Sequence, residues 1–157
     1  MPFFFPIQNP DEGVYVALLV HDYKILLLKH KKHEHWFFPH GYSLLQEIPD
    51  DTLKRICLDQ TRIIANPLEY SPIADQNDTK RCAIPLHNEM RSFGSHKVYC
   101  SYYLCKAMNP NDAIASEDHG IVEMRWYTKD ELLALNLPQG ILDICILSLE
   151  KQMKFEF

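Results

Sequence analysis

The sequence VYVALLVHDYKILLLK, residues 14–29, carries the strongest structural signal in the chain. Its first seven residues are apolar and rich in β-branched side chains, which is typical of a strand buried on both faces. His21–Tyr23 supply a polar turn, and Lys24–Lys29 form a second apolar run. The stretch therefore predicts a β-hairpin between residues 14–20 and 24–29.

The residues after this hairpin predict a polar tip, a short strand and a loop. His30–His35 hold two lysines and three histidines, and Trp36–Pro39 follow as a short strand that the proline ends. Gly41–Gln46 are expected to form a loop. The tip is either a solvated turn or a site for phosphate or an acidic partner. His33 and His35, at strand spacing, are a further candidate pair for a stray metal ion.

A helix is predicted from Pro49 to about Ile63. Proline suits the first helical turn, and Asp50 and Asp51 follow it, where the helix dipole favours negative charge. Apolar residues recur on one face of this segment. Ile64–Ser95 contains three prolines and predicts one or two short strands, with a mobile loop near residues 75–81.

The last third of the chain predicts two strands and two helices. Lys97–Lys106 and Glu123–Tyr127 have the aromatic and β-branched content of strands. Thr128 precedes Lys-Asp-Glu, a capping-box pattern that opens a helix through Leu135. Ile141–Lys151 is amphipathic and predicts a final helix. The element order indicates a single α/β domain, residues 1–157, with a mixed sheet between helices.

Composition excludes several classes of partner. The net charge is −5 and the sequence pI is about 5.9, so there is no overall basic field to hold nucleic acid generically. The longest apolar run, Val14–Val20, is too short to cross a bilayer. A membrane partner is therefore not expected.

Cysteine usage and the first residues indicate a reducing compartment. The five cysteines are an odd number and contain no C-x-x-C, so neither a disulfide framework nor a zinc site is predicted. Met1–Ile7 are apolar but lack a basic region and are broken by prolines, unlike a signal peptide. We therefore expect a cytoplasmic protein.

Two segments resemble the Nudix hydrolases. WFFPHG at Trp36–Gly41 stands where the family typically has W-x-x-P-G-G, and E-x-x-W-Y-T-x-x-E-L at Glu123–Leu132 is similar to the closing strand and helix of the family. The resemblance covers most of the chain except roughly residues 64–95. It implies a Nudix-like α/β/α sandwich.

The family's box, G-x5-E-x7-R-E-U-x-E-E-x-G-U with U bulky and apolar, can be placed on this chain from Gly41. Glu47 and Arg55 then match their positions. The other fixed positions carry different residues, namely Ile56, Asp59, Gln60 and Arg62. Of these, only Asp59 keeps an acidic side chain.

The resemblance implies cleavage of a pyrophosphate bond in a nucleoside diphosphate linked to another group, with Mg²⁺ or Mn²⁺. Three acids at i, i+3 and i+4 lie on one helix face, where their carboxylates can converge on a hard cation. Here these positions are Ile56, Asp59 and Gln60, so the formal charge on that face falls from three negatives to one.

The site residues implied by this alignment fall into three groups. Catalytic candidates are Glu47, Arg55 and Asp59, and substrate-binding candidates are His40 and Gly41. Metal-ligand candidates are Asp59, Glu47, Gln60 and Glu123, with the His40 carbonyl joining the shell. Glu117 and Asp118 are further acids in the region from which the family can draw a ligand.

Several positions allow a purely structural interpretation. Ile56 could pack against the sheet or fill the former metal pocket. Asp59 could be a solvated helix acid or a residual ligand. Glu47 and Arg55 could form a structural ion pair rather than act on a substrate. Arg62 replaces a glycine, so either the loop differs or strain of about 1 kcal/mol is accepted.

Two functions remain open from sequence. One is a metal-dependent hydrolase of nucleoside diphosphate-linked pyrophosphates whose activity is weak or lost. The other is a catalytically silent module that binds a nucleotide-like ligand or a protein partner. Loss of single well-placed catalytic groups commonly costs about 10²–10³ in rate, so losing two acids disfavours efficient hydrolysis.

Overall fold

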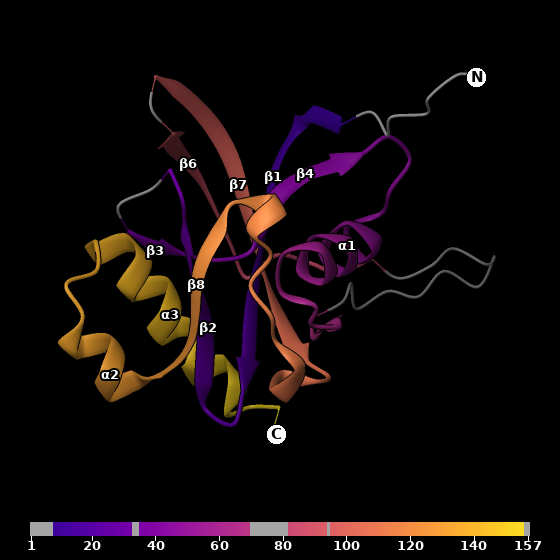
Figure 1. Cartoon of the computed structure of the whole chain (residues 1–157). Helices are drawn as coiled ribbons and strands as arrows, with labels where there is room; N and C mark the ends of the chain where they lie inside the picture. The colour runs from indigo at the N-terminus through magenta and orange to yellow at the C-terminus, as the bar shows by residue number, and fades with distance from the viewer. Residues whose placement is uncertain (1–7, 33–34, 70–81, 94, 156–157) are drawn as a thin grey trace.

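The computed structural model describes residues 8–32, 35–69, 82–93 and 95–155 (Figure 1). Strands β1–β4 are Gln8–His21, Lys24–His30, Trp36–Phe37 and His40–Leu44. Strands β5–β8 are Ala65–Pro67, His87–Phe93, His96–Ala107 and Ile121–Thr128. The α-helices are α1, Pro49–Thr61, α2, Lys129–Ala134, and α3, Gln139–Gln152, and the short 3-10 helices are Pro110–Asp112 and Glu117–His119.

The strands form one mixed sheet built around β1. Its main path runs β3-β2-β1-β7-β5, with β4 also paired to β1, β6 to β7 and β8 to β2. β1 and β7 are parallel, in the register Val14 with Cys100, and the other pairs are antiparallel. The predicted hairpin is confirmed, because Val20 pairs with Ile25 across the β1–β2 turn.

Helices cover both faces of this sheet, which confirms the predicted α/β sandwich. On β1, Val16 and Leu18 belong to the core beneath α3, and Ala17 and Leu19 belong to the core beneath α1 (Figure 1). Because β1 is covered on both sides, Val14–Val20 are buried throughout. This explains the continuous apolar run in the sequence.

The prediction of a loop at Gly41–Gln46 is wrong over most of its length. Residues 40–44 form β4, in which Gly41 pairs with Tyr15 and Tyr42 with Val14. The segment HGYSL has no alternation of apolar and polar residues. Its strand conformation depends on the distant partner β1, which local propensity does not report.

The remaining elements follow the sequence predictions closely. α1 begins at Pro49 as predicted and ends at Thr61, two residues earlier than predicted. The described residues between 64 and 95 include two strands, β5 and β6, and the predicted loop at 75–81 lies outside the described residues. Thr128 and Glu131 form both hydrogen bonds of the predicted capping box. None of the helices among the described residues has the length and apolar character needed to cross a bilayer.

Candidate functional site

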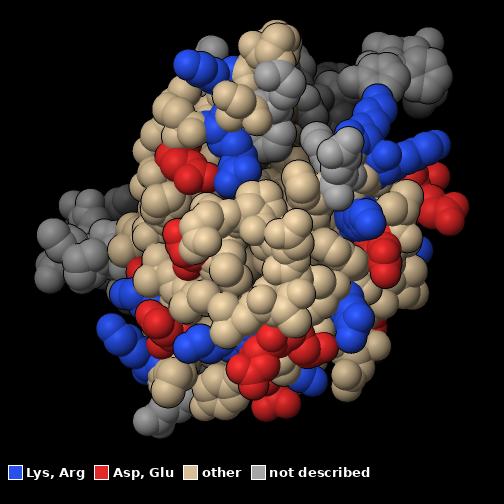
Figure 2. Space-filling view, turned by 90° about the vertical axis from the view of Figure 1, so that its left-hand side faces the viewer, with Lys and Arg blue, Asp and Glu red and all other residues tan. Residues whose placement is uncertain are grey.

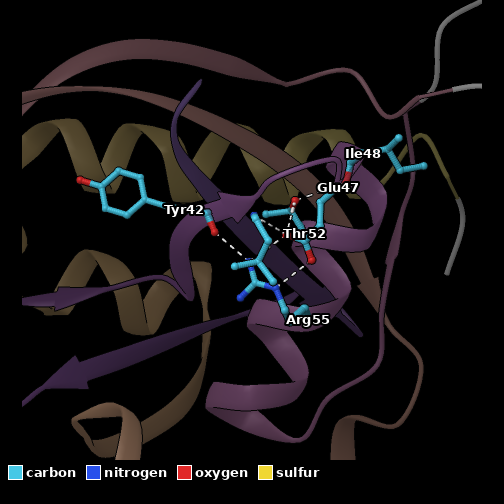
Figure 3. Close-up of polar contacts among 6 residues, drawn as sticks. Tyr42, Glu47, Ile48, Thr52 and Arg55 are labelled. Carbon is cyan, nitrogen blue, oxygen red and sulfur yellow. Dashed lines mark hydrogen bonds and ion pairs between the residues drawn. The ribbon is translucent and has the colours of Figure 1, made fainter. Parts of the chain in front are cut away.

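Glu47 and Arg55 form an ion pair that joins the start of α1 to β4 (Figure 3). Arg55 Nε lies 2.8 Å from Glu47 Oε2, and its Nη2 donates to Glu47 Oε1 at 3.0 Å. The same Nη2 donates to the Tyr42 carbonyl at 2.8 Å. Arg55 on α1 therefore ties the Glu47 side chain in the loop before the helix to a carbonyl of β4. These contacts support the structural interpretation of the two positions.

The Glu47 carboxylate has a full set of donors. Oε1 also accepts from the Leu44 backbone N–H at 2.7 Å and from the Thr52 hydroxyl at 3.1 Å. Burial acts to raise the pKa of Glu47, but the hydrogen bonds from Arg55 and Leu44 and the positive charge of Arg55 outweigh it and lower the pKa below its usual value. Glu47 is thus a charged anchor of the loop before α1.

Ile56, at the first acid position of the box, packs against the sheet. Its exposed fraction is 2%, and it belongs to the core shared with Leu53, Cys57 and the β1 residues beneath α1. A Cβ built on Gly41 would lie 3.3 Å from Ile56 Cδ1. The branched side chain therefore lies directly beside the Gly41 backbone, and glycine leaves room for it.

Gln60, at the last acid position, pairs with the backbone of His40. Its Nε2 donates to the His40 carbonyl at 2.7 Å, and the His40 N–H donates to Gln60 Oε1 at 3.4 Å. We call this pair of contacts the Gln60–His40 bracket. The carbonyl that the resemblance offers to a metal thus already accepts a hydrogen bond from the protein itself.

The carboxylates predicted as metal ligands, Glu47, Asp59 and Glu123, are not brought together. Asp59 is exposed on α1, and Glu123 is exposed on β8, opposite Lys29. In the described part of the chain, no three His, Cys, Asp or Glu side chains are grouped so that they could hold a metal ion. Magnesium usually binds through one or two protein carboxylates plus water and substrate phosphates, and the described residues offer it no cluster of three such ligands.

Arg62 ends α1 in the left-handed conformation that the family's glycine would favour. Its φ is 61°, and its N–H donates to the Leu58 carbonyl at 3.0 Å. The chain therefore keeps the left-handed helix end although the residue is an arginine, and it accepts backbone strain of about 1 kcal/mol. Of the two alternatives for this position, a different loop or a strained one, the structure has the strained one.

The basic hairpin tip contacts a segment that sequence reasoning did not place beside it. The Lys31 N–H donates to the Gly120 carbonyl at 2.7 Å, and His30, Lys31, Lys32, His119 and Gly120 line a hollow of about 320 Å³. His35 is exposed, and His33 lies outside the described residues. The hollow gathers two lysines and two histidines.

A half-buried polar cluster in the core beneath α3 was also missed. The Tyr102 hydroxyl donates to Glu89 Oε1 at 2.5 Å, and Arg91 Nε donates to the same oxygen at 3.1 Å. His87 Nε2 lies 3.3 Å from Glu89 Oε2, and the Arg91 guanidinium lies over the Phe37 ring. The alternation of His, Glu and Arg at strand spacing in β6 was the available signal.

The Gln60–His40 bracket gives a direct prediction. Gln60→Ala should lower the free energy of unfolding by about 1 kcal/mol, because the His40 carbonyl loses its partner. Urea denaturation at neutral pH measures this. Lys54→Ala, on the exposed face of the same helix, is the matched control and should change stability by less than about 0.5 kcal/mol. Equal stabilities of the two variants would contradict the bracket.

Comparison with known proteins gives matches in structure. No family model and no curated protein matches the sequence. The chain is similar to a Nudix-family hydrolase from Clostridium perfringens, with TM-score 0.77, 18% identity and coverage of 88% of this chain and 96% of that one. It is similar to a MutT protein from Methanosarcina mazei Go1, with TM-score 0.64, 16% identity and coverage of 88% and 93%.

A MutT Nudix hydrolase from Burkholderia pseudomallei aligns with TM-score 0.56 and 19% identity, over 87% of this chain and 94% of that one. These likenesses show that the chain has the Nudix fold. Because the identities are low, the likenesses concern the arrangement of the elements and carry no information about the substrate.

Proposed function

We propose that this chain is a Nudix-superfamily protein in which metal-dependent hydrolysis of nucleoside diphosphate-linked pyrophosphates is weak or lost. In this proposal the fold serves as a catalytically silent module that binds a nucleotide-like ligand. The observation that carries the proposal is the Gln60–His40 bracket beside the buried Ile56. Any residual activity would require Mg²⁺ or Mn²⁺.

The Gln60–His40 bracket and Ile56 each disfavour the binding of a metal ion, for different reasons. Gln60 presents an N–H donor to the His40 carbonyl, where a cation would need the carbonyl oxygen as a ligand. Ile56 has no atom that can bind a cation or accept a proton. Without the cation, the attacking water is not activated and the charge that develops on phosphate is not offset.

The positive charges at the hairpin tip support the binding of an anionic ligand. The hollow lined by Lys31 and Lys32 offers their ammonium groups to an anionic group such as a phosphate. His40 and Gly41 lie on β4, and both are only partly buried. We further propose a reducing, cytoplasmic location, because all five cysteines are free thiols and four are buried.

The direct test is phosphate release from a panel of nucleoside diphosphate-linked compounds, with Mg²⁺ and then Mn²⁺. We expect the wild-type protein to show no turnover above Asp59→Ala on any compound, because no three of the described carboxylates are close enough together to hold one metal ion. An active Nudix hydrolase assayed in parallel controls for the substrates and metals. Metal-dependent turnover that disappears in Asp59→Ala would overturn the proposal.

A further inference from the structure

A wide groove lies between the end of α1 and the loop before β8. We call it the α1-end groove. It has a volume of about 940 Å³. Its lining combines acidic side chains, exposed aliphatic side chains and a backbone fixed by hydrogen bonds. Two of the aligned box positions, Asp59 and Arg62, line it, whereas His40, Ile56 and Gln60 do not.

Hydrogen bonds fix the loop before β8 against the end of α1 and so define the shape of the groove. The Ile114 N–H donates to the Thr61 carbonyl at 2.9 Å, and the Ser116 N–H donates to the Gln60 carbonyl at 3.1 Å. The Asn109 side chain accepts from the Ile64 N–H at 2.7 Å and donates to the Arg62 carbonyl at 3.1 Å. The loop is therefore fastened to α1 along its length, and a ligand would meet a preformed surface.

The charge of the groove is predominantly negative. Four carboxylates line it, from Asp59, Asp112, Glu117 and Asp118, against the single arginine Arg62 and the histidine His119. Among the described residues, the carboxylates of Asp59, Glu117 and Asp118 form no ion pair or side-chain hydrogen bond within the protein. α1 also has no basic residue in its last turn, so its negative dipole end adds to the field.

Aliphatic side chains lie among these acids. Leu58, Ile64 and Ile114 are 52%, 51% and 56% exposed, and all three line the groove. By contrast, acidic and basic side chains are interspersed on the face that carries α2 and α3 (Figure 2). A surface that combines apolar contacts with one sign of charge is complementary to a segment that is both aliphatic and cationic.

We propose that the α1-end groove binds a basic, aliphatic-rich peptide segment of a partner protein. Lysine or arginine side chains of the segment would pair with Glu117, Asp118 and Asp59, and its aliphatic side chains would cover Leu58 and Ile114. A single metal ion does not explain the groove, since no three metal-binding side chains are grouped there. Asp59 belongs both to this groove and to the aligned box, so the inference is tested at Glu117, Asp118 and Ile114, which lie outside the box.

The test uses a fluorescein-labelled, capped peptide in which leucines alternate with lysines and arginines, with binding followed by anisotropy. Glu117→Gln combined with Asp118→Asn should weaken binding fivefold to tenfold, since each exposed ion pair contributes up to about 1 kcal/mol. Ile114→Ser should weaken it by a similar factor through loss of apolar contact. Higher salt should weaken binding to the wild type more than to the acid-to-amide variant.

The matched control removes the same two charges elsewhere. Asp130→Asn with Glu150→Gln changes exposed acids on α2 and α3 and should leave the peptide affinity unchanged. Circular dichroism verifies that each variant is folded. The proposal is overturned if the wild type does not bind the peptide or if the control double variant weakens binding equally. It is also overturned if spermidine, a cation without aliphatic side chains, competes as well as the unlabelled peptide.

Discussion

The double variant Ile56→Glu, Gln60→Glu should acquire a magnesium-dependent stability that the wild-type protein lacks. Without metal it should be much less stable than the wild type, because a carboxylate at position 56 enters a core layer where Ile56 is almost fully buried. The second glutamate loses the N–H that Gln60 gives to the His40 carbonyl. With Asp59, the two new acids restore the i, i+3, i+4 arrangement on one helix face.

The size of the magnesium effect follows from linkage. A metal at one hundred times its dissociation constant stabilises the folded state by about 2.7 kcal/mol. For a chain of this length that corresponds to a rise in Tm of about 5–10 °C. Thermal denaturation with EDTA and with excess Mg²⁺ measures the difference for wild type and variant.

A neutral control separates charge from shape in this experiment. Ile56→Gln introduces a polar side chain at the same position without a carboxylate, so it should be destabilised and should not respond to Mg²⁺. If the double variant folds and its Tm is the same with EDTA and with Mg²⁺, Ile56 and Gln60 do not occupy the metal-binding positions of the box. The placement of the box from Gly41 would then be wrong.

Arg55→Ala should lower the free energy of unfolding by about 2–3 kcal/mol, because it leaves the Glu47 carboxylate and the Tyr42 carbonyl without their charged donor. The expected fall in Tm is about 5–10 °C. Arg125→Ala is the control. Its pair with Glu131 involves side chains that are 61% and 40% exposed, against 29% and 16% for Arg55 and Glu47, so its loss should cost less than about 1 kcal/mol.

The effect of Arg55→Ala should depend on pH in a definite direction. In the folded protein the pKa of Glu47 is lowered, so its stabilising contribution is present above the unfolded pKa, which is about 4.3 for glutamate. That contribution is lost as the pH falls through the folded pKa. The Tm difference between wild type and Arg55→Ala should therefore be large near neutral pH and shrink in strong acid. A difference that stays constant over this range would contradict the role of the ion pair.

Much of the fold could be predicted because its signals are local. The continuous apolar run in β1 and the turn after it are sufficient for the hairpin, and Thr128 with Glu131 is sufficient for the start of α2. β4 could not be predicted in this way, because HGYSL becomes a strand only beside β1. The partner lies far away in the sequence and provides the missing hydrogen bonds.

The sequence was sufficient to identify the residues of the candidate site, but not to predict the contacts that these residues make. Alignment with the box shows that Ile56 and Gln60 are not acids, and it leaves open what they do instead. That Gln60 pairs with His40, twenty residues earlier, depends on β4 lying beside α1. The α1-end groove likewise depends on the loop after β7 returning to the end of α1, for which the sequence has no local signal.

If the proposed function is right, the wild-type chain binds no divalent metal at the positions aligned with the Nudix box. The most direct measurement is electron paramagnetic resonance of free Mn²⁺ titrated with wild-type protein, with Asp59→Asn in parallel. We expect the free Mn²⁺ signal to be the same with wild type, with the variant and in buffer. A stoichiometric loss of the free Mn²⁺ signal with wild type, restored by Asp59→Asn, would contradict the claim.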